Sequence, residues 1–157
     1  MSISVKYIQP NNSLLQYVAD NMRDADALEC KLLSGMSPME ALTKGVEVSH
    51  HCSVVVIDGK PCAVVGLVVL NILTGTGVPW LLATYDAIKY RRIFINNCKQ
   101  GVEDMMTVCP NLMNFVHADN TLSIKWLKWM GFTIKPSEPI GKDGAHFHKF
   151  YIGDCHV

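Results

Sequence analysis

The sequence has no excess of charge of either sign, because 14 lysine and arginine residues balance 14 aspartate and glutamate residues. A chain without net charge has no overall field to attract a nucleic acid or an anionic membrane surface. It also has no apolar run near the ~20 residues needed to cross a bilayer, since the longest spans only 62–70. We therefore expect neither a nucleic-acid partner nor a membrane span.

The six cysteines form no C-x-x-C pair, and the amino terminus has no apolar signal core. We expect reduced thiols in a cytoplasm, most of them acting as small core residues. His146 and His148 share one face of an expected strand, and Cys155-His156 follows in the tail. Because this spacing fits no standard zinc pattern, no metal site is predicted.

Local patterns predict a single domain over residues 1–157, built from alternating strands and helices. Asp58-Gly59 between two β-branched runs is typical of a tight hairpin, because Asp-Gly accepts positive φ. Ser37, followed by Pro38 and Glu40, predicts a helix start, with Gly45 as the stop. The expected strands cover 2–8, 52–57, 62–70, 78–84, 112–117, 132–135 and 146–152, and the expected helices cover about 14–28, 38–44, 86–109 and 122–130.

The stretch 112–132 is the most informative part of the chain. An apolar run over 112–118 is typical of a buried strand, and 122–130 is typical of a helix. Asp119 or Asn120 stands in the N-cap position, and Gly131 follows the expected helix end. Gly131-Phe132 begins eleven positions after Asn120.

The strand, Asn120 and Gly131-Phe132 resemble the second half of the acyl-CoA binding core of the GNAT N-acetyltransferase superfamily, where N-x-x-A-x-x-L-Y-x-x-x-G-F follows the fifth strand. The resemblance implies an α/β (α+β) fold. Its mixed central sheet would have about six or seven strands flanked by about four helices, in the order β-α-α-β-β-β-α-β-α-β-β.

Two features depart from that family pattern. Leu127 stands where the family usually has a tyrosine that protonates the leaving thiolate, and leucine has no proton to give. The turn over 83–92 contains no glycine, whereas the family has R/Q-x-x-G-x-G/A there to cradle the cofactor pyrophosphate on helix amides. We therefore expect acetyl-CoA to bind weakly or not at all.

Candidate site residues follow from the same comparison. Histidine or glutamate side chains near the sheet are candidates for a catalytic base only because they ionise, and these are His117, His51 and Glu47. Cations near the expected helix start could form a replacement anion site, or they could be solvated while Asp86 supplies the cap. If acyl-CoA binds, the candidate residues are Thr84, Lys89, Arg91, Arg92 and Asn120.

Within the superfamily, the sequence is closer to small GNAT-like proteins of short-tailed bacteriophages, including an internal virion protein. This likeness is carried by Trp80-x-x-x-Thr84, Trp126-Leu127-Lys128-x-x-Gly131 and Gly144-x-x-Phe147. It implies a phage-encoded, catalytically degenerate protein that needs no cofactor. Such a protein would act through protein contacts in virion assembly, in the host cytoplasm or in the virion.

The partner implied by that hypothesis is a phage or host protein, or a second copy of the chain. Trp126 and Trp129 lie three positions apart on a helix that is apolar on more than one side, so they are the candidate interface residues. The alternative is a divergent acyl-CoA-dependent N-acetyltransferase acting on a protein or a small amine, with acetyl-CoA as its cofactor.

Overall fold

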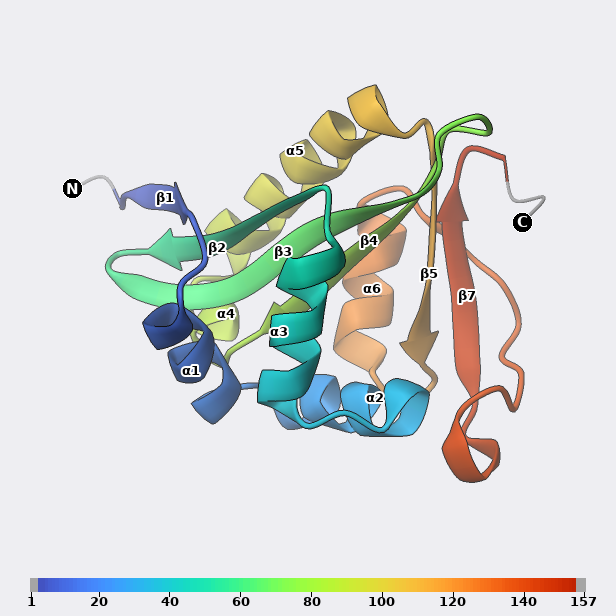
Figure 1. Cartoon of the computed structure of the whole chain (residues 1–157), viewed down its shortest axis with the longest axis horizontal. Coiled ribbons are helices and arrows are strands. Elements are labelled where there is room, and N and C mark those ends of the chain that lie inside the picture. Colours follow the sequence, from blue (N-terminus) through green and yellow to red (C-terminus); the bar gives the residue numbers. More distant parts are fainter. Residues whose placement is uncertain (1–2, 155–157) are drawn as a thin grey trace.

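The computed structural model describes residues 3–154. Within them, seven strands form one mixed sheet in the order β1-β2-β3-β4-β5-β7-β6. Figure 1 shows the sheet from β1 to β5 and on to β7. Every neighbouring pair is antiparallel except β4 and β5, which are parallel. The predicted α+β fold class with a mixed sheet is confirmed. The strands are β1 (Val5–Ile8), β2 (His51–Ile57), β3 (Lys60–Asn71), β4 (Thr76–Ala83), β5 (Asn111–His117), β6 (Thr133–Ile134) and β7 (Phe147–Ile152).

Helices cover both faces of the sheet. Leu15 and Leu42 bring α1 and α3 onto one face, and Ala87, Phe94 and Val102 bring α4 and α5 onto the other, where α6 also packs. Helix α2 lies across the ends of β4 and β5 (Figure 1). The helices are α1 (Asn12–Asp20), α2 (Asp24–Ser34), α3 (Pro38–Val48), α4 (Asp86–Lys89), α5 (Arg91–Val108) and α6 (Thr121–Trp129), with a short 3-10 turn at Lys142–Gly144.

Several local predictions are confirmed. Asp58 and Gly59 have φ values of 50° and 76° and join β2 to β3 as a tight hairpin. Ser37 and Glu40 form a reciprocal capping box at the start of α3. Asn120, one of the two residues proposed for the cap, accepts a hydrogen bond from the Ser123 N–H at the start of α6.

Three helix boundaries differ from prediction. The segment predicted as one helix over 14–28 is two helices, because Met22 bridges Thr84 and the Arg23 N–H donates to the Ala83 carbonyl. Gly45 does not end α3, which continues to Val48. A glycine is needed at this position because the Trp80 ring lies where a side chain would otherwise stand. The helix predicted after β4 is interrupted at Tyr90, where α4 ends and α5 begins.

The parallel pair β4–β5 separates soon after it begins. Only Thr76 with Asn111 and Gly77 with Leu112 are in register as neighbours, although both strands continue for several residues. The resemblance to the GNAT fold predicts that the strands expected over 78–84 and 112–117 lie parallel and splay apart, and this prediction is confirmed. The sheet is therefore open between the carboxyl-terminal halves of β4 and β5, and α2 closes the lower end of this gap. No helix in the described part of the chain is long and apolar enough to cross a membrane.

Candidate functional site

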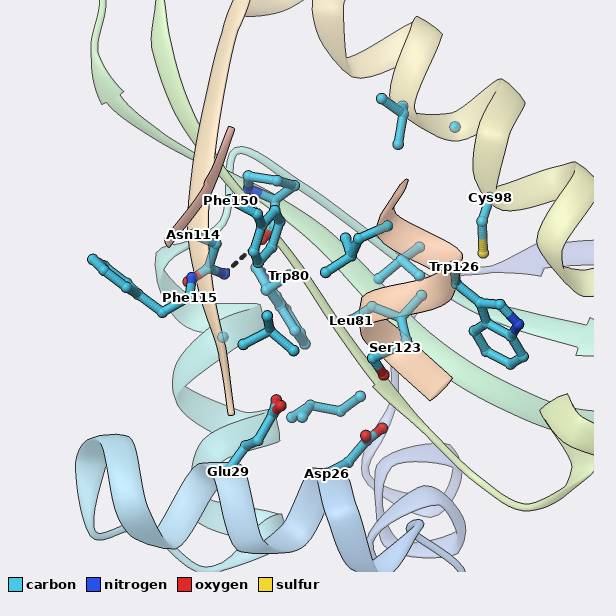
Figure 2. Close-up of a pocket in the computed structure, with 18 of the residues that line it drawn as sticks. Asp26, Glu29, Trp80, Leu81, Cys98, Asn114, Phe115, Ser123, Trp126 and Phe150 are labelled. Carbon is cyan, nitrogen blue, oxygen red and sulfur yellow. Dashed lines mark hydrogen bonds between the residues drawn. The ribbon is translucent and has the colours of Figure 1, made fainter. Parts of the chain in front are cut away.

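A cavity of about 450 Å³ occupies the gap between β4 and β5 (Figure 2). Its walls come from both faces of the sheet, since α3 contributes Ala41 and Gly45 while α5 and α6 contribute Phe94, Cys98 and Leu127. The lining is mostly apolar, with few polar groups, which is the usual character of a small-molecule site. The cavity thus connects the two faces through the sheet.

The inner edge of β4 forms one wall of this cavity. The Pro79 carbonyl accepts a 2.7 Å hydrogen bond from Asn114 Nδ2 of β5, and the Ala83 N–H donates to Asp26 at 2.7 Å. Backbone groups alternate in direction along a strand, so the Leu81 peptide points the same way as those of Pro79 and Ala83. Leu81 lines the cavity, and its backbone N–H and carbonyl face the gap. It lies between Pro79 and Ala83, whose backbone groups are already hydrogen-bonded.

Two carboxylates from α2 form the floor of the cavity, and Figure 2 shows both pointing up from the helix into the gap. Asp26 is buried and pairs with Arg23, whose Nη1 lies 3.0 Å from Oδ1. Arg23 also donates to the Asn120 side-chain oxygen and to the Ser123 hydroxyl, both at 3.3 Å. Burial raises the pKa of Asp26, although the guanidinium of Arg23 and the Ala83 N–H counteract that effect. This network joins α2 to β4 and α6.

Glu29 lies one helical turn beyond Asp26. Its Oε1 accepts hydrogen bonds from the His117 N–H and from Asn120 Nδ2, each 2.9 Å long. Burial is the largest effect on this group and raises its pKa to about 7, even though both hydrogen bonds favour the ionised form. A carboxylate with a pKa near neutrality, held at a cavity floor, has the properties of a general base.

Thiols and hydroxyls also line the cavity. Burial raises the pKa of Cys98 to about 12 and that of Cys30 to about 11, so both thiols stay protonated at neutral pH and are poor nucleophiles. The Ser123 hydroxyl lies on α6 one turn before Leu127, and both residues line the cavity. Leu127, which stands at the position of the tyrosine in the GNAT pattern, gives this wall an apolar side chain without a proton to donate.

The three residues proposed as a base lie outside the cavity wall. His117 is buried with its ring against Phe147, while its backbone N–H supports Glu29. His51 is exposed at the start of β2 and lies 3.4 Å from the Ser53 hydroxyl. Glu47 is exposed on α3. None of these three residues belongs to the lining of the cavity.

The five residues proposed to hold acyl-CoA fall into two groups. Thr84 and Asn120 are buried, with the Thr84 hydroxyl donating to the Pro61 carbonyl and the Asn120 side chain joining Arg23 to Glu29. The cations Lys89, Arg91 and Arg92 are exposed, and the ammonium of Lys89 lies 5.3 Å from the Tyr90 ring centroid.

In the turn that begins α4, backbone N–H groups donate hydrogen bonds to carbonyls of the same turn. The Ala87 N–H donates to the Thr84 carbonyl, and the Ile88 N–H donates to the Tyr85 carbonyl. The Asp86 carboxylate accepts a 2.9 Å hydrogen bond from the Tyr17 hydroxyl. Because these amides are already bonded and a carboxylate lies beside them, this turn offers no cradle for a diphosphate.

Trp126 and Trp129, the proposed interface residues, have different surroundings. The Trp126 ring packs against Phe94 with centroids 5.8 Å apart and lines the cavity. Trp129 is 49% exposed, and the Lys99 ammonium lies 4.7 Å from its ring centroid. Trp126 therefore belongs to the wall of the cavity, whereas Trp129 is available to a partner.

Trp129→Ala should lower the free energy of unfolding by less than about 1 kcal/mol, because half of the indole is in water and the Lys99 contact is a surface cation–π interaction. Trp126→Ala, which removes a packed ring, should cost about 3 kcal/mol. Urea unfolding measures both changes, and sedimentation of the Trp129 variant shows whether this face supports self-association. Equal losses in the two variants would contradict the assignment of Trp129 to the surface.

Residues 3–154 contain no group of three histidine, cysteine, aspartate or glutamate side chains close enough to hold a metal ion. His146 Nδ1 lies 3.2 Å from the Ser137 hydroxyl, and His148 Nδ1 lies 2.7 Å from the Lys135 carbonyl. Cys155 and His156 lie outside the described residues.

Neither a protein-family model nor a curated protein sequence matches this chain. Solved structures match it over almost its whole length. Spermidine N-acetyltransferase from Vibrio cholerae, in complex with CoA and spermine, is 10% identical with a TM-score of 0.67, covering 96% of this chain and 94% of that one. The chain has the fold of the GNAT acetyltransferases.

Two further GNAT-fold structures support this assignment. A Bacillus subtilis acetyltransferase in complex with CoA has a TM-score of 0.65 at 11% identity, covering 98% of this chain and 99% of that one. A GNAT-family acetyltransferase from Streptococcus pneumoniae has a TM-score of 0.62 at 15% identity, covering 97% of this chain and 100% of that one. At such low identity the likeness establishes the GNAT fold alone.

The reasoning from sequence missed Asp26 and Glu29. The one available signal was their three-residue spacing within an otherwise apolar part of α2, which places both carboxylates on the same helix face. That pattern is equally typical of a solvated helix. Only the packing of α2 across the ends of β4 and β5 distinguishes the two cases.

Proposed function

We propose that this GNAT-fold protein is an acyl-CoA-dependent N-acetyltransferase that transfers an acetyl group to an amine. The observation that carries the proposal is the cavity through the sheet, with Glu29 at its floor. A cavity that is lined from both faces of the sheet lets a thioester and an amine approach each other from opposite sides. The structural neighbours that contain CoA support the same assignment.

The acyl-pantetheine arm of CoA fits the residues of the cavity. This arm is a narrow chain with two amide groups, and an exposed strand edge binds such a chain through backbone hydrogen bonds. The Leu81 peptide supplies one N–H and one carbonyl on the inner edge of β4. The apolar walls from α5 and α6, including Phe94 and Leu127, exclude water around the thioester.

Glu29 is the group that we assign to proton transfer. Above its pKa of about 7 it is ionised and can take a proton from the ammonium group of the acceptor, which leaves a neutral amine able to attack the thioester. The His117 N–H and Asn120 Nδ2 both hold Oε1, which fixes the orientation of the carboxylate. Leu127 cannot donate a proton to the departing thiolate, so we expect solvent to protonate the thiolate.

The diphosphate of CoA does not fit the α4 turn, because the turn amides are bonded and Asp86 lies beside them. The nucleotide should therefore contribute little to binding. We expect S-acetyl-pantetheine, which lacks the nucleotide, to react with a kcat/KM within about tenfold of that for acetyl-CoA. Steady-state release of free thiol with each donor measures this ratio. A preference above about a hundredfold for acetyl-CoA would mean that other residues bind the nucleotide.

The basic experiment is release of free thiol from acetyl-CoA in the presence and absence of primary amines. Amine-dependent release supports the acetyltransferase assignment. A second candidate is a non-catalytic protein that acts through contacts, as the phage resemblance implies, and it is favoured by Leu127 and by the closed α4 turn. No release with any amine, together with no binding of either thioester, would favour that candidate.

A further inference from the structure

The cavity opens to solvent between α2 and α3. The exposed residues in this part of its lining include Leu33, Ser34, Lys44 and Val48, with Leu33 and Val48 each more than 40% exposed. The mouth is therefore rimmed by aliphatic side chains and one ammonium group. A ligand that enters here passes apolar surface before it reaches Glu29.

Aromatic rings form the walls behind this mouth. Trp80 is fixed by a 2.7 Å hydrogen bond from its Nε1 to the Ser49 hydroxyl and lies against Gly45 and Gly66. Phe115 lines the same cavity from β5 and points away from α6 (Figure 2). Rigid aromatic faces of this kind bind an apolar body, and they also attract a cation that lies over the ring.

The charged side chains of the cavity provide a partner for one positive charge on a ligand. The charged side chains in its lining are Asp26, Glu29 and Lys44. Asp26 is already neutralised by Arg23, with which it forms a buried ion pair. Glu29 is therefore the one acidic group left for a ligand, and Lys44 at the mouth repels a second positive charge. A polyamine with several ammonium groups would leave all but one of them without an acidic partner.

From this arrangement we propose that the acceptor is a small primary amine with a single positive charge on an apolar body, such as an arylalkylamine, and not a polyamine. This inference rests on the proposed acetyltransferase function. The Vibrio cholerae spermidine N-acetyltransferase shares the fold of this chain, but the spermine bound in its structure carries several positive charges. The amino group lies toward Glu29, and the apolar body lies against Trp80 and the aliphatic mouth.

The transfer step balances with the groups named. The ammonium gives one proton to Glu29, and the amine nitrogen forms a bond to the acyl carbon of the thioester while the carbon–sulfur bond breaks. The sulfur leaves as a thiolate and takes a proton from solvent, and the second amine proton passes to water as the amide forms. The products are an N-acetyl amide and a free thiol, with no change in oxidation state.

The test compares phenethylamine with spermidine as acceptors for S-acetyl-pantetheine, with free thiol as the readout. We expect kcat/KM for phenethylamine to exceed that for spermidine by at least about tenfold. Lys44→Glu, which reverses the charge at the mouth, should reduce this ratio at least about fivefold. Lys31→Glu makes the same charge change on an exposed position of α2 outside the lining and should leave the ratio unchanged.

Calorimetry with phenethylamine alone separates this inference from the function on which it rests. Saturable binding of phenethylamine that is lost in Glu29→Gln supports the acceptor site even if no thioester reacts, in which case only the transferase function fails. Thiol release that is equal or faster with spermidine overturns the acceptor inference while the transferase function stands. An equal effect of Lys31→Glu and Lys44→Glu would also overturn it, because the selectivity would then follow net charge rather than the mouth.

Discussion

Glu29→Gln is expected to lower kcat/KM for amine acetylation by about 100- to 10,000-fold at pH 8, the usual effect of removing a general base. Glutamine keeps an oxygen that can accept from the His117 N–H and from Asn120 Nδ2, so the local structure should persist. Thiol release measures the loss. Glu47→Gln makes the same change at an exposed position of α3 and serves as the matched control, with activity expected to stay unchanged.

The pH dependence of the proposed activity in the wild-type protein tests the same assignment. The base must be ionised, so kcat/KM should rise with pH through the Glu29 pKa of about 7 and level off above it. The residual activity of Glu29→Gln should lack this step. A wild-type profile without a step near neutrality, or a variant that keeps the step, would contradict the role of Glu29.

Stability provides an independent readout of the Glu29 environment. Burial raises the folded-state pKa of this acid from 4.5 to about 7, so the unfolded chain loses the proton first as the pH rises. Its contribution to stability is therefore complete below pH 4.5 and is lost progressively between pH 4.5 and 7. Because glutamine stays neutral, Glu29→Gln should melt at a higher temperature than wild type at pH 8, with little difference at pH 4.

Arg23→Met should lower the free energy of unfolding by about 3–5 kcal/mol, because it leaves the buried Asp26 carboxylate without its partner. The same change removes the donors to Asn120 and Ser123, which tie α2 to α6. Urea unfolding at pH 7 measures the loss. Arg92→Met, at an exposed position of α5, is the matched control and should change stability by less than about 0.5 kcal/mol.

Restoring a neutral site should recover part of that loss. The double variant Arg23→Met with Asp26→Asn keeps an acceptor for the Ala83 N–H but removes the unpaired charge. We expect it to be more stable than Arg23→Met alone. If the single variant loses as little as Arg92→Met does, the network does not hold α2 against the sheet.

The fold could be predicted wherever local chemistry agreed with tertiary packing. Asp58-Gly59 allows the positive φ values of the hairpin, and Ser37 with Glu40 caps α3. Both signals depend on neighbouring residues alone, so they can be recognised without any tertiary contact. The spacing from Asn120 to Gly131 also marked α6 correctly, since Asn120 caps the helix and Gly131 follows it with φ of 103°. These signals identified the succession of strands and the GNAT-like arrangement, whereas the division of the 14–28 segment into α1 and α2 was not predicted.

The cavity floor could not be predicted because its chemistry arises from packing. In the sequence, Asp26 and Glu29 resemble ordinary acidic residues on a helix surface. The pairing of residues 22–23 with the end of β4 is what places α2 below the gap between β4 and β5. Gly45 was likewise predicted to end a helix, whereas the structure shows that a glycine is needed there because the Trp80 ring leaves no space for a side chain. The absence of glycine in the α4 turn was visible in the sequence, and the structure adds that the turn amides are bonded internally.

The most direct test of the central claim is an amide NMR titration of ¹⁵N-labelled protein with S-acetyl-pantetheine. If the gap between β4 and β5 binds the acyl arm, the Leu81 amide resonance should shift in a saturable manner, because its N–H faces the cavity. The Ala83 amide should move less, because it is already bonded to Asp26. Shifts confined to the exposed 89–92 segment, or no saturable shift at all, would contradict the account.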